Sequence, residues 1–568
     1  MTESERPRVA TVARGLRWQT LIAEVVALLL ILALVFAKLA AVSGSSWRTV
    51  FLANGDSLVL PLLLQSLERG EPSDWVFSSQ TFFFPEFPLY ALCGLIMGTA
   101  QGGLVLNAAL NVVLLYLGFR AITAAFAPRK RIRQLLVSLS AVLAFLVVVL
   151  CESGVRVLGV GTVEPSRIAT LFLMTTYYGG ALLISLGMLA LVYWGSTRFR
   201  GGVVDRRRIL VYGLVVVLVS GAITYSNPLY LLWFVAPFCA TLLLLLILRR
   251  ITLRWALILV FPHILGIGAG MLARGVFARY IAANIDAYLS TFGASQAASL
   301  LLSVVRGWLE SPLGILQLLI LVLPFALVVV FLIRHSRHGG VGDPPRATTS
   351  ELFIAVFILI AGISLIAVQV GAGRSVTRYL LPLFVFPLLA LLLVRGEKME
   401  RLLHSVQTRL RIVLAVTLSS AAILTIGLSA PAVADLASPR SPVDTACLSN
   451  WLSTKPDGGR NVNGVGSFWT VRALALYGDQ KGRLVQVILP LSIHAWMNNL
   501  SLYEGATFSY AVADQVITGS SLREVLGKPG SIVRCDGFSI YDYAGTRGQT
   551  SLNDDIQRSE EILKLSRH

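Results

Sequence analysis

Apolar runs close to 20 residues long recur along this chain, and they constrain its fold more than any other feature. The hydrocarbon core of a bilayer is about 30 Å thick, so a helix of about 20 apolar residues can cross it. We assign eleven candidate spans, at 19–43, 103–126, 135–151, 168–195, 209–224, 228–248, 255–273, 312–333, 351–370, 379–394 and 412–430. The chain is therefore predicted to be a polytopic α-helical membrane protein.

The composition excludes the main alternatives. Of the 568 residues, 55% are hydrophobic and only 14% are charged, whereas about 25% of residues are charged in a typical soluble protein. A single soluble core stops growing near about 250–300 residues, so it could not bury this much apolar surface. A soluble globular enzyme, a disordered chain and a coiled coil are excluded.

The distribution of basic residues predicts the orientation, because cytoplasmic loops carry an excess of Lys and Arg. If the proline-containing stretch 82–99 does not cross, the N-terminal segment and the loops on its side hold 24 basic residues, against nine in the opposite loops. We therefore place the N-terminus in the cytoplasm and 82–99 at the outer membrane interface. The net charge of +18 is then mostly topogenic, which argues against a nucleic-acid partner.

The composition changes near Pro431, where charged residues return and apolar runs shorten to strand length. Alternating helix and strand patterns predict a small extracytoplasmic α/β domain. They include a helix at 493–500, and the polar tail after Tyr543 is expected to be frayed. The predicted division is a transmembrane domain over 1–430, whose first outer loop is 44–102, and an outer domain over 431–568.

Cys447 and Cys535 are the only two cysteines of the predicted outer domain. An oxidising outer compartment favours a disulfide between them, which would join positions 88 residues apart. The alternative is two unpaired thiols. The sequon Asn499-Leu500-Ser501 leaves a eukaryotic secretory origin open beside the bacterial one that the composition suggests.

No P-loop, HExxH, CxxC or GxSxG motif is present, so hydrolase and nucleotide-driven classes lose support. The remaining candidates are ionisable residues at the predicted outer face, where such groups are functional hypotheses. Asp56, in Asn54-Gly55-Asp56-Ser57, could act as a general base toward an acceptor hydroxyl. The alternative is that it caps the amphipathic helix expected at 57–68.

Arg374 and Arg378 precede the tenth candidate span and could bind a phosphate. The alternative is that both side chains extend to lipid headgroups. Six more residues at the predicted outer face are possible substrate-binding residues: Glu86, Arg156, Glu164, Arg167, Tyr225 and Asn227. The structural alternatives are Glu–Arg pairing for the loop 152–167 and a simple Asn-Pro turn after Tyr225.

In combination these features resemble the GT-C superfamily of membrane glycosyltransferases. The layout is similar to the branch of protein O-mannosyltransferases and aminoarabinose transferases. The resemblance covers roughly residues 15–430. Three short motifs carry it: Asn54-Gly55-Asp56, the aromatic-proline run from Phe84 to Tyr90, and Arg378-Tyr379-Leu380-Leu381-Pro382-Leu383.

The resemblance implies transfer of a sugar from a polyprenyl-phosphate carrier to a cell-wall glycan, glycolipid or protein acceptor. The reaction would take place at the outer face of the bacterial cytoplasmic membrane. By this resemblance Asp56 is the base or orients the acceptor, and Arg378 with Arg374 binds the carrier phosphate. The family often carries a Lys before the prolines, where this chain has Glu86 and no Lys. No resident metal is implied, although a divalent cation stays open.

Two other functions remain as alternatives. A transporter, flippase or polysaccharide polymerase would place ionisable groups at mid-membrane and often show internal repeats. This chain has no evident repeat, and its charged residues lie toward the span ends. An interaction module on an inert anchor would not need eleven spans.

Overall fold

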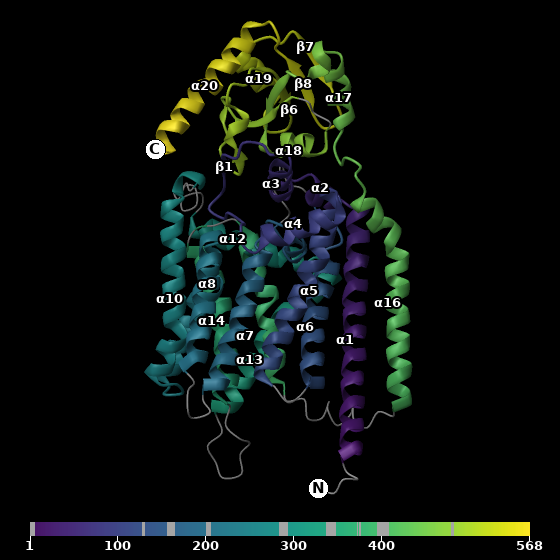
Figure 1. The fold of residues 1–568 in the computed structure, drawn as a ribbon, viewed down its shortest axis with the longest axis vertical. Helices are drawn as coiled ribbons and strands as arrows, with labels where there is room; N and C mark the ends of the chain where they lie inside the picture. The colour runs from purple at the N-terminus through teal and green to yellow at the C-terminus, as the bar shows by residue number, and fades with distance from the viewer. Residues whose placement is uncertain are drawn as a thin grey trace.

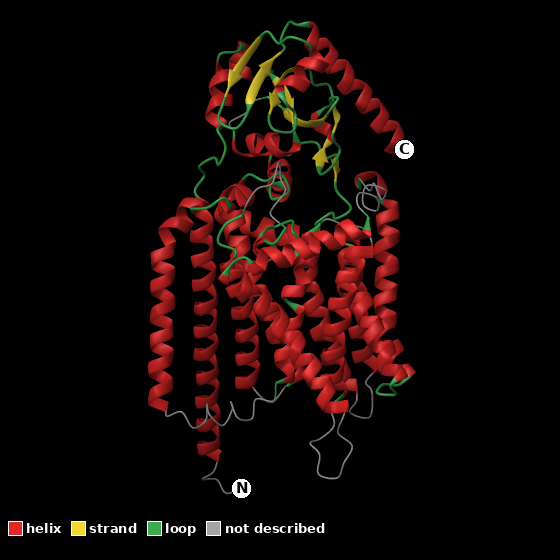
Figure 2. Cartoon of the chain, turned by 180° about the vertical axis from the view of Figure 1, so that it is seen from behind, coloured by secondary structure: helices red, strands yellow, loops and turns green. Residues whose placement is uncertain are grey.

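The computed structural model describes residues 6–127, 131–155, 165–199, 206–282, 293–336, 348–371, 373, 376–394, 408–478 and 482–567. A bundle of long helices forms one part, and a smaller domain that contains most of the strands lies at one end of it (Figure 1). The view from behind shows the strands confined to that end (Figure 2). Helix α1 begins at the opposite end of the bundle (Figure 1). The chain is thus a polytopic α-helical membrane protein with a small C-terminal sheet domain.

Eight helices of the described residues are long and apolar enough to cross a membrane, and each matches a predicted span. They are α1 (Arg6–Ser43), α5 (Ala100–Phe126), α6 (Arg131–Cys151), α8 (Arg206–Ser226), α10 (Leu253–Val276), α13 (Pro312–Ser336), α14 (Thr349–Gly371) and α16 (Thr408–Ala437).

The other three predicted spans contain irregular segments. The stretch 168–195 divides into the 3-10 helix η1 (Ala169–Leu173) and α7 (Gly179–Phe199). The stretch 228–248 forms the π-helix η2 (Leu231–Val235) and α9 (Ala236–Ile247). The stretch 379–394 forms two 3-10 helices, η4 (Thr377–Phe384) and η5 (Phe386–Leu393). Proline explains the last case, because Pro382 and Pro387 lack the N–H that an α-helix needs.

Three short helices lie at the end of the bundle that faces the sheet domain (Figure 1). They are α2 (Trp47–Leu52), α3 (Val59–Glu68) and α4 (Glu86–Met97). Helix α4 has 12 residues, so it extends about 18 Å and is too short to cross a core of about 30 Å. This length agrees with the interfacial position predicted for 82–99. The amphipathic helix α12 (Ala294–Leu309) and the short η3 (Ala278–Tyr280) are also found at this end.

The C-terminal domain contains a mixed six-stranded sheet of order β4-β3-β2-β6-β8-β7. Strand β2 pairs in parallel with β3 and β6, and the other neighbours are antiparallel. The strands are β2 (Asn463–Gly466), β3 (Leu484–Ile488), β4 (Ser492–Ile493), β6 (Phe508–Ala513), β7 (Ser531–Arg534) and β8 (Ser539–Asp542). The accompanying helices are α17 (Thr445–Ser453), η6 (Pro456–Gly459), α18 (Phe468–Tyr477), α19 (Gly519–Leu526) and α20 (Arg547–Arg567).

Two expectations for this domain are wrong. Residues 493–500 do not form a helix. They contain the last residue of β4 and the whole of the short β5 (Asn498–Asn499), and η7 (Leu500–Leu502) follows. Met497 has a φ of 51°, which a right-handed helix cannot accommodate. The tail is the 21-residue helix α20, held by the buried side chains of Leu552 and Ile556. The sequence of this tail is so polar overall that the apolar i, i+4 pair was not recognised as the buried side of a helix.

Cys447 and Cys535 form a disulfide, with their Cα atoms 5.8 Å apart. Among the described residues, these two cysteines and Asp444 are the only group of possible metal ligands whose ligand atoms lie close enough together to hold an ion. Both sulfur atoms are already bonded to each other, so this group is a cross-link between α17 and the turn after β7.

Replacing both cysteines with serine is expected to lower the free energy of unfolding of the outer domain by about 2–5 kcal/mol. Thermal unfolding of the detergent-solubilised protein measures this loss. Cys239→Ser, which removes a free thiol, is the control. Labelling of wild-type Cys447 and Cys535 without reductant would contradict the prediction.

Arg567 attaches the end of α20 to the first outer loop. Its guanidinium donates to both carboxylate oxygens of Asp74, at 2.7 and 2.6 Å, and to the carbonyl of Arg279 at 3.0 Å. The hydrogen bond from Arg567 lowers the pKa of Asp74 below the ordinary value of 3.8. The stabilisation is therefore present above about pH 4 and is lost as the pH falls through the lowered pKa.

We expect the last two turns of α20 to exchange amide hydrogens faster once the pH falls below about 4. Asp74→Asn should produce a similar increase at neutral pH. The effect should be about 1 kcal/mol or less, since the pair is partly exposed. Asp555→Asn, which removes a surface carboxylate within the same helix, is the control. Unchanged exchange in Asp74→Asn at neutral pH would contradict the attachment.

Candidate functional site

Asp56 and Arg378, 322 residues apart in the sequence, form an ion pair in the structure. The Nη1 atom of Arg378 lies 3.0 Å from Oδ2 of Asp56, and the two side chains are 31% and 15% exposed. Asp56 lies between α2 and α3, and Arg378 is the second residue of η4. The structure thus joins the predicted base to one of the predicted phosphate-binding arginines.

Asp56 does not cap the following helix. Helix α3 begins at Val59, and Leu58 occupies the N-cap position without a side-chain hydrogen bond. The peptide N–H of Asp56 instead donates to Oδ1 of Asn54 at 2.9 Å, and the Thr176 hydroxyl donates to the Asp56 carbonyl at 2.7 Å. These bonds fix the backbone of the turn, while the carboxylate binds Arg378.

Tyrosine rings surround the guanidinium of Arg378. The ring centroids of Tyr177 and Tyr178 lie 5.5 and 5.6 Å from its central carbon, which is cation–π range. Tyr178 also contacts the ring of Tyr379, with the centroids 5.5 Å apart. Low-dielectric walls strengthen the interactions of a charge with its partners.

Both tyrosines belong to the connection between η1 and α7, inside the predicted continuous span 168–195. The polar and glycine-containing sequence Thr175-Thr176-Tyr177-Tyr178-Gly179-Gly180 is the signal that could have revealed this break.

Arg472, a residue that the sequence did not single out, reaches the same turn from the outer domain. It lies on α18, is 3% exposed and donates from Nη1 to the carbonyl of Gly55 at 3.0 Å. Its Nε donates to Oε1 of Gln486 at 3.1 Å, and Nη2 donates to the carbonyl of Met497. Burial lowers the pKa of Arg472, and the charge of nearby Asp56 is the largest influence that raises it. Asp56 therefore lies in the field of two guanidinium groups.

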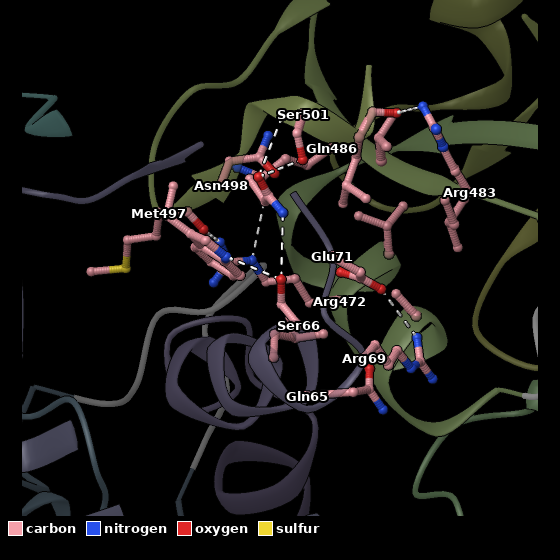
Figure 3. A pocket seen from close by; sticks show the side chains of 18 of the residues that line it. Gln65, Ser66, Arg69, Glu71, Arg472, Arg483, Gln486, Met497, Asn498 and Ser501 are labelled. Atoms are coloured by element: carbon pink, nitrogen blue, oxygen red, sulfur yellow. Dashed lines mark hydrogen bonds and ion pairs between the residues drawn. The ribbon is translucent and has the colours of Figure 1, made fainter. Parts of the chain in front are cut away.

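A cleft of about 310 Å³ separates α3 from the outer domain (Figure 3). Some of its polar lining residues bind within the outer domain, and others bind across the cleft to the first loop. The Gln486 amide donates to the carbonyls of His494 and Trp496 at 2.7 Å each. The Asn499 amide donates to the Ser66 hydroxyl at 3.4 Å and to the Pro72 carbonyl at 3.0 Å. The cleft therefore marks the contact surface on which the outer domain meets the first loop.

Asn499 is 1% exposed in this contact, so the sequon that it opens is not accessible in the folded protein. Strand β5, which contains it, pairs antiparallel with β1 (Trp75–Val76) of the first loop.

Glu86 is buried beside the start of α7. It is 5% exposed, and a Cβ added to Gly180 would lie 2.5 Å from its carboxyl carbon. The carboxyl thus packs against the first turn of α7. Glu86 occupies the protein interior beside Pro85.

Tyr225 and Asn227 hold the backbone and do not join the Asp56 pair. The Tyr225 carbonyl accepts a bond from Arg274 at 2.7 Å, and the same guanidinium donates to the Ser79 carbonyl at 2.8 Å. Asn227 is fully buried, and its Oδ1 accepts the N–H of Leu229 at 3.2 Å. Both residues therefore support the first loop and the turn into α9.

The structure describes the remaining predicted residues only in part. Arg156, Glu164 and Arg374 fall outside the described residues. Arg167 is half-buried next to η1. The Glu152 carboxylate caps η1, because it accepts the N–H groups of Ile168, Ala169 and Thr170 at 2.7–3.0 Å.

No family model and no curated protein matches the sequence. Solved structures that the comparison finds include ArnT from Cupriavidus metallidurans bound to undecaprenyl phosphate, with a TM-score of 0.45 and 11% identity over 90% of this chain and 98% of that one. An oligosaccharyltransferase from Archaeoglobus fulgidus, in complex with zinc and sulfate, has a TM-score of 0.43 and 13% identity over 85% of this chain and 68% of that one. The same enzyme tethered to an acceptor peptide gives a TM-score of 0.39 and 12% identity over 85% of this chain and 69% of that one.

Proposed function

We propose that this protein is a membrane glycosyltransferase that moves a sugar from a polyprenyl-phosphate carrier to an acceptor. The acceptor is a cell-wall glycan, a glycolipid or a protein at the outer face of the bacterial cytoplasmic membrane. The N-terminus is then cytoplasmic and the C-terminal domain extracytoplasmic. The observation that carries the proposal is the Asp56–Arg378 pair, 3.0 Å apart and walled by Tyr177 and Tyr178.

Asp56 supplies the general base in this proposal. Its carboxylate accepts the proton of the acceptor hydroxyl while that oxygen forms a bond to the anomeric carbon of the sugar. The bond between the anomeric carbon and the phosphate oxygen breaks, and the electron pair leaves with the polyprenyl phosphate. The transfer is balanced without a nucleotide or a redox partner.

Arg378 binds the carrier phosphate and stabilises it as the leaving group. Its guanidinium has five N–H donors, of which the bond to Asp56 uses one. The buried Nε has no hydrogen-bond partner among the described residues. An unpaired buried donor is costly, so a phosphate oxygen is a suitable partner for it. Arg374 is the proposed second arginine.

The lipid carrier reaches the site from the bilayer. Helix α4 exposes Leu92, Leu95 and Ile96, by 54%, 67% and 64% respectively, close to the first-loop elements that carry Asp56. An apolar face of this kind suits contact with acyl or polyprenyl chains.

The proposal is tested with membranes that contain the wild-type chain and a set of radiolabelled polyprenyl-phosphate sugars, with and without EDTA. Transfer of label from one donor supports the enzyme class and identifies the donor, and the EDTA arm shows whether a divalent cation takes part. No transfer from any donor by folded protein would contradict the proposal. That result would favour a transporter or a polymerase that uses diphosphate-linked glycans.

A further inference from the structure

We propose that the outer domain completes this site, with Arg472 as the residue that positions the turn Asn54-Gly55-Asp56. The inference rests on the proposed function, because it assigns Arg472 a role through Asp56. Arg472 does not touch the reacting atoms in this account. It acts through the backbone of the residue before the proposed base.

Helix α18 binds the first loop on both sides of Asp56. The Tyr477 hydroxyl donates to the Leu52 carbonyl at 2.7 Å, and Arg472 donates to the Gly55 carbonyl at 3.0 Å. Beyond the turn, the Gln65 amide donates to the Leu476 carbonyl at 3.4 Å. The outer domain therefore contacts the first loop at points from the end of α2 to the second turn of α3.

The ring of Phe468, in the first turn of α18, packs against Gly55. A Cβ added to Gly55 would lie 2.5 Å from the Phe468 ring, so only glycine allows this approach. The guanidinium of Arg472 lies over the same ring, 4.1 Å from its centroid. Gln486 and the Met497 carbonyl fix the other donors of Arg472. The side chain is therefore held in one orientation.

The turn is thus fixed by both parts of the protein. Asn54 and Thr176 bind the N–H and the carbonyl of Asp56 from within the membrane domain and its first loop. Arg472 binds the adjacent Gly55 carbonyl from the outer domain. A displacement of a catalytic group by about 1 Å can cost about 10²-fold in rate. The position of the Asp56 carboxylate therefore depends on the docked outer domain.

The chemistry of Arg472 points to more than a structural contact. A buried guanidinium is costly unless it is paired, and the hydrogen bonds found for Arg472 go to neutral oxygens. A neutral amide side chain could hold two domains together without this cost. The positive charge interacts with the Phe468 ring, 4.1 Å from its centroid, and with the nearby Asp56 carboxylate, whose charge raises the pKa of Arg472.

The test uses the full-length chain in lipid nanodiscs with Arg472→Gln, Arg472→Lys and the control Arg534→Gln, which changes an exposed arginine on the edge strand β7. Arg472→Gln should lower kcat about 10²-fold while the donor KM changes less than about twofold, because Arg472 does not bind the phosphate. Arg472→Lys should recover part of kcat. In the Asp56→Asn background, Arg472→Gln should lower the residual rate no further.

Amide hydrogen exchange of residues 50–58 provides a readout that needs no substrate. It should rise in Arg472→Gln and stay unchanged in Arg534→Gln. If Arg472→Gln does not fold, Gly55→Ala offers a second variant, since its methyl group would push the turn from Phe468 and should also lower kcat.

An unchanged kcat in Arg472→Gln would overturn the inference. So would an equal fold-decrease in kcat when Arg472→Gln is made in the wild-type chain and in the Asp56→Asn variant. If the wild-type chain transfers no label, the proposed function fails. Hydrogen exchange then decides separately whether Arg472 orders the turn.

Discussion

Replacing Asp56 with asparagine is expected to reduce sugar transfer by about 10²–10⁴-fold, the usual contribution of a general base. The amide keeps the shape of the side chain and can still accept a hydrogen bond from Arg378, but it cannot take a proton from the acceptor. Insertion and folding should be unchanged, because Thr176 and Asn54 bind backbone atoms of Asp56 and not its carboxylate. Label transfer from a polyprenyl-phosphate sugar, normalised to the amount of folded protein, measures the loss.

Asp435→Asn is the matched control for this substitution. Asp435 also pairs with an arginine near an outer helix end, at 2.5 Å from Arg48, but it has no place in the proposed reaction. Transfer should persist in this variant. Wild-type rates in Asp56→Asn would remove Asp56 as the base.

The positions of the spans could be predicted because the bilayer imposes one length and one polarity on every crossing helix. Prediction failed where local chemistry interrupted a run that was apolar on average. The Thr-Thr-Tyr-Tyr-Gly-Gly sequence divides 168–195, and Pro382 and Pro387 turn 379–394 into 3-10 helix. The first of these breaks is the one that places Tyr177 and Tyr178 around Arg378.

The candidate site was predictable only in part, for a related reason. Asp56 and Arg378 stand out in the sequence because charged residues are rare beside apolar spans. Arg472 has no such contrast, since an arginine on a short helix of a mixed domain is typical of a solvent-exposed face. Only the docking of α18 on the first loop buries it. That contact joins residues 417 positions apart, which no local pattern encodes.

The surroundings of Glu86 could not be predicted from the sequence either. The sequence marked Glu86, in the aromatic-proline run, as a possible substrate-binding residue, and the fold packs its carboxyl against the N-terminus of α7. Gly180, in the first turn of α7, makes room for the carboxyl, and this contact joins two segments that are distant in sequence.

Arg378→Ala is expected to raise the apparent KM for the lipid donor by about 10- to 100-fold. Each hydrogen bond to a charged group is worth about 1.5–3 kcal/mol, and the variant loses the buried Nε donor together with the rest of the guanidinium. The same variant should lower kcat, because Asp56 loses its partner at 3.0 Å. Arg378→Lys should be intermediate, since an ammonium keeps the charge but cannot bind a carboxylate and a phosphate in the geometry of a planar fork.

Initial rates over a range of donor concentrations separate the two effects, with Arg48→Ala as the control. Arg48 is also an arginine paired with an aspartate near the outer end of the bundle, so its loss should leave the donor KM unchanged. A lowered kcat in Arg378→Ala with an unchanged donor KM would show that Arg378 acts only on Asp56. In that case the carrier phosphate must bind elsewhere, because the arginine that pairs with the base would contribute nothing to holding the leaving group.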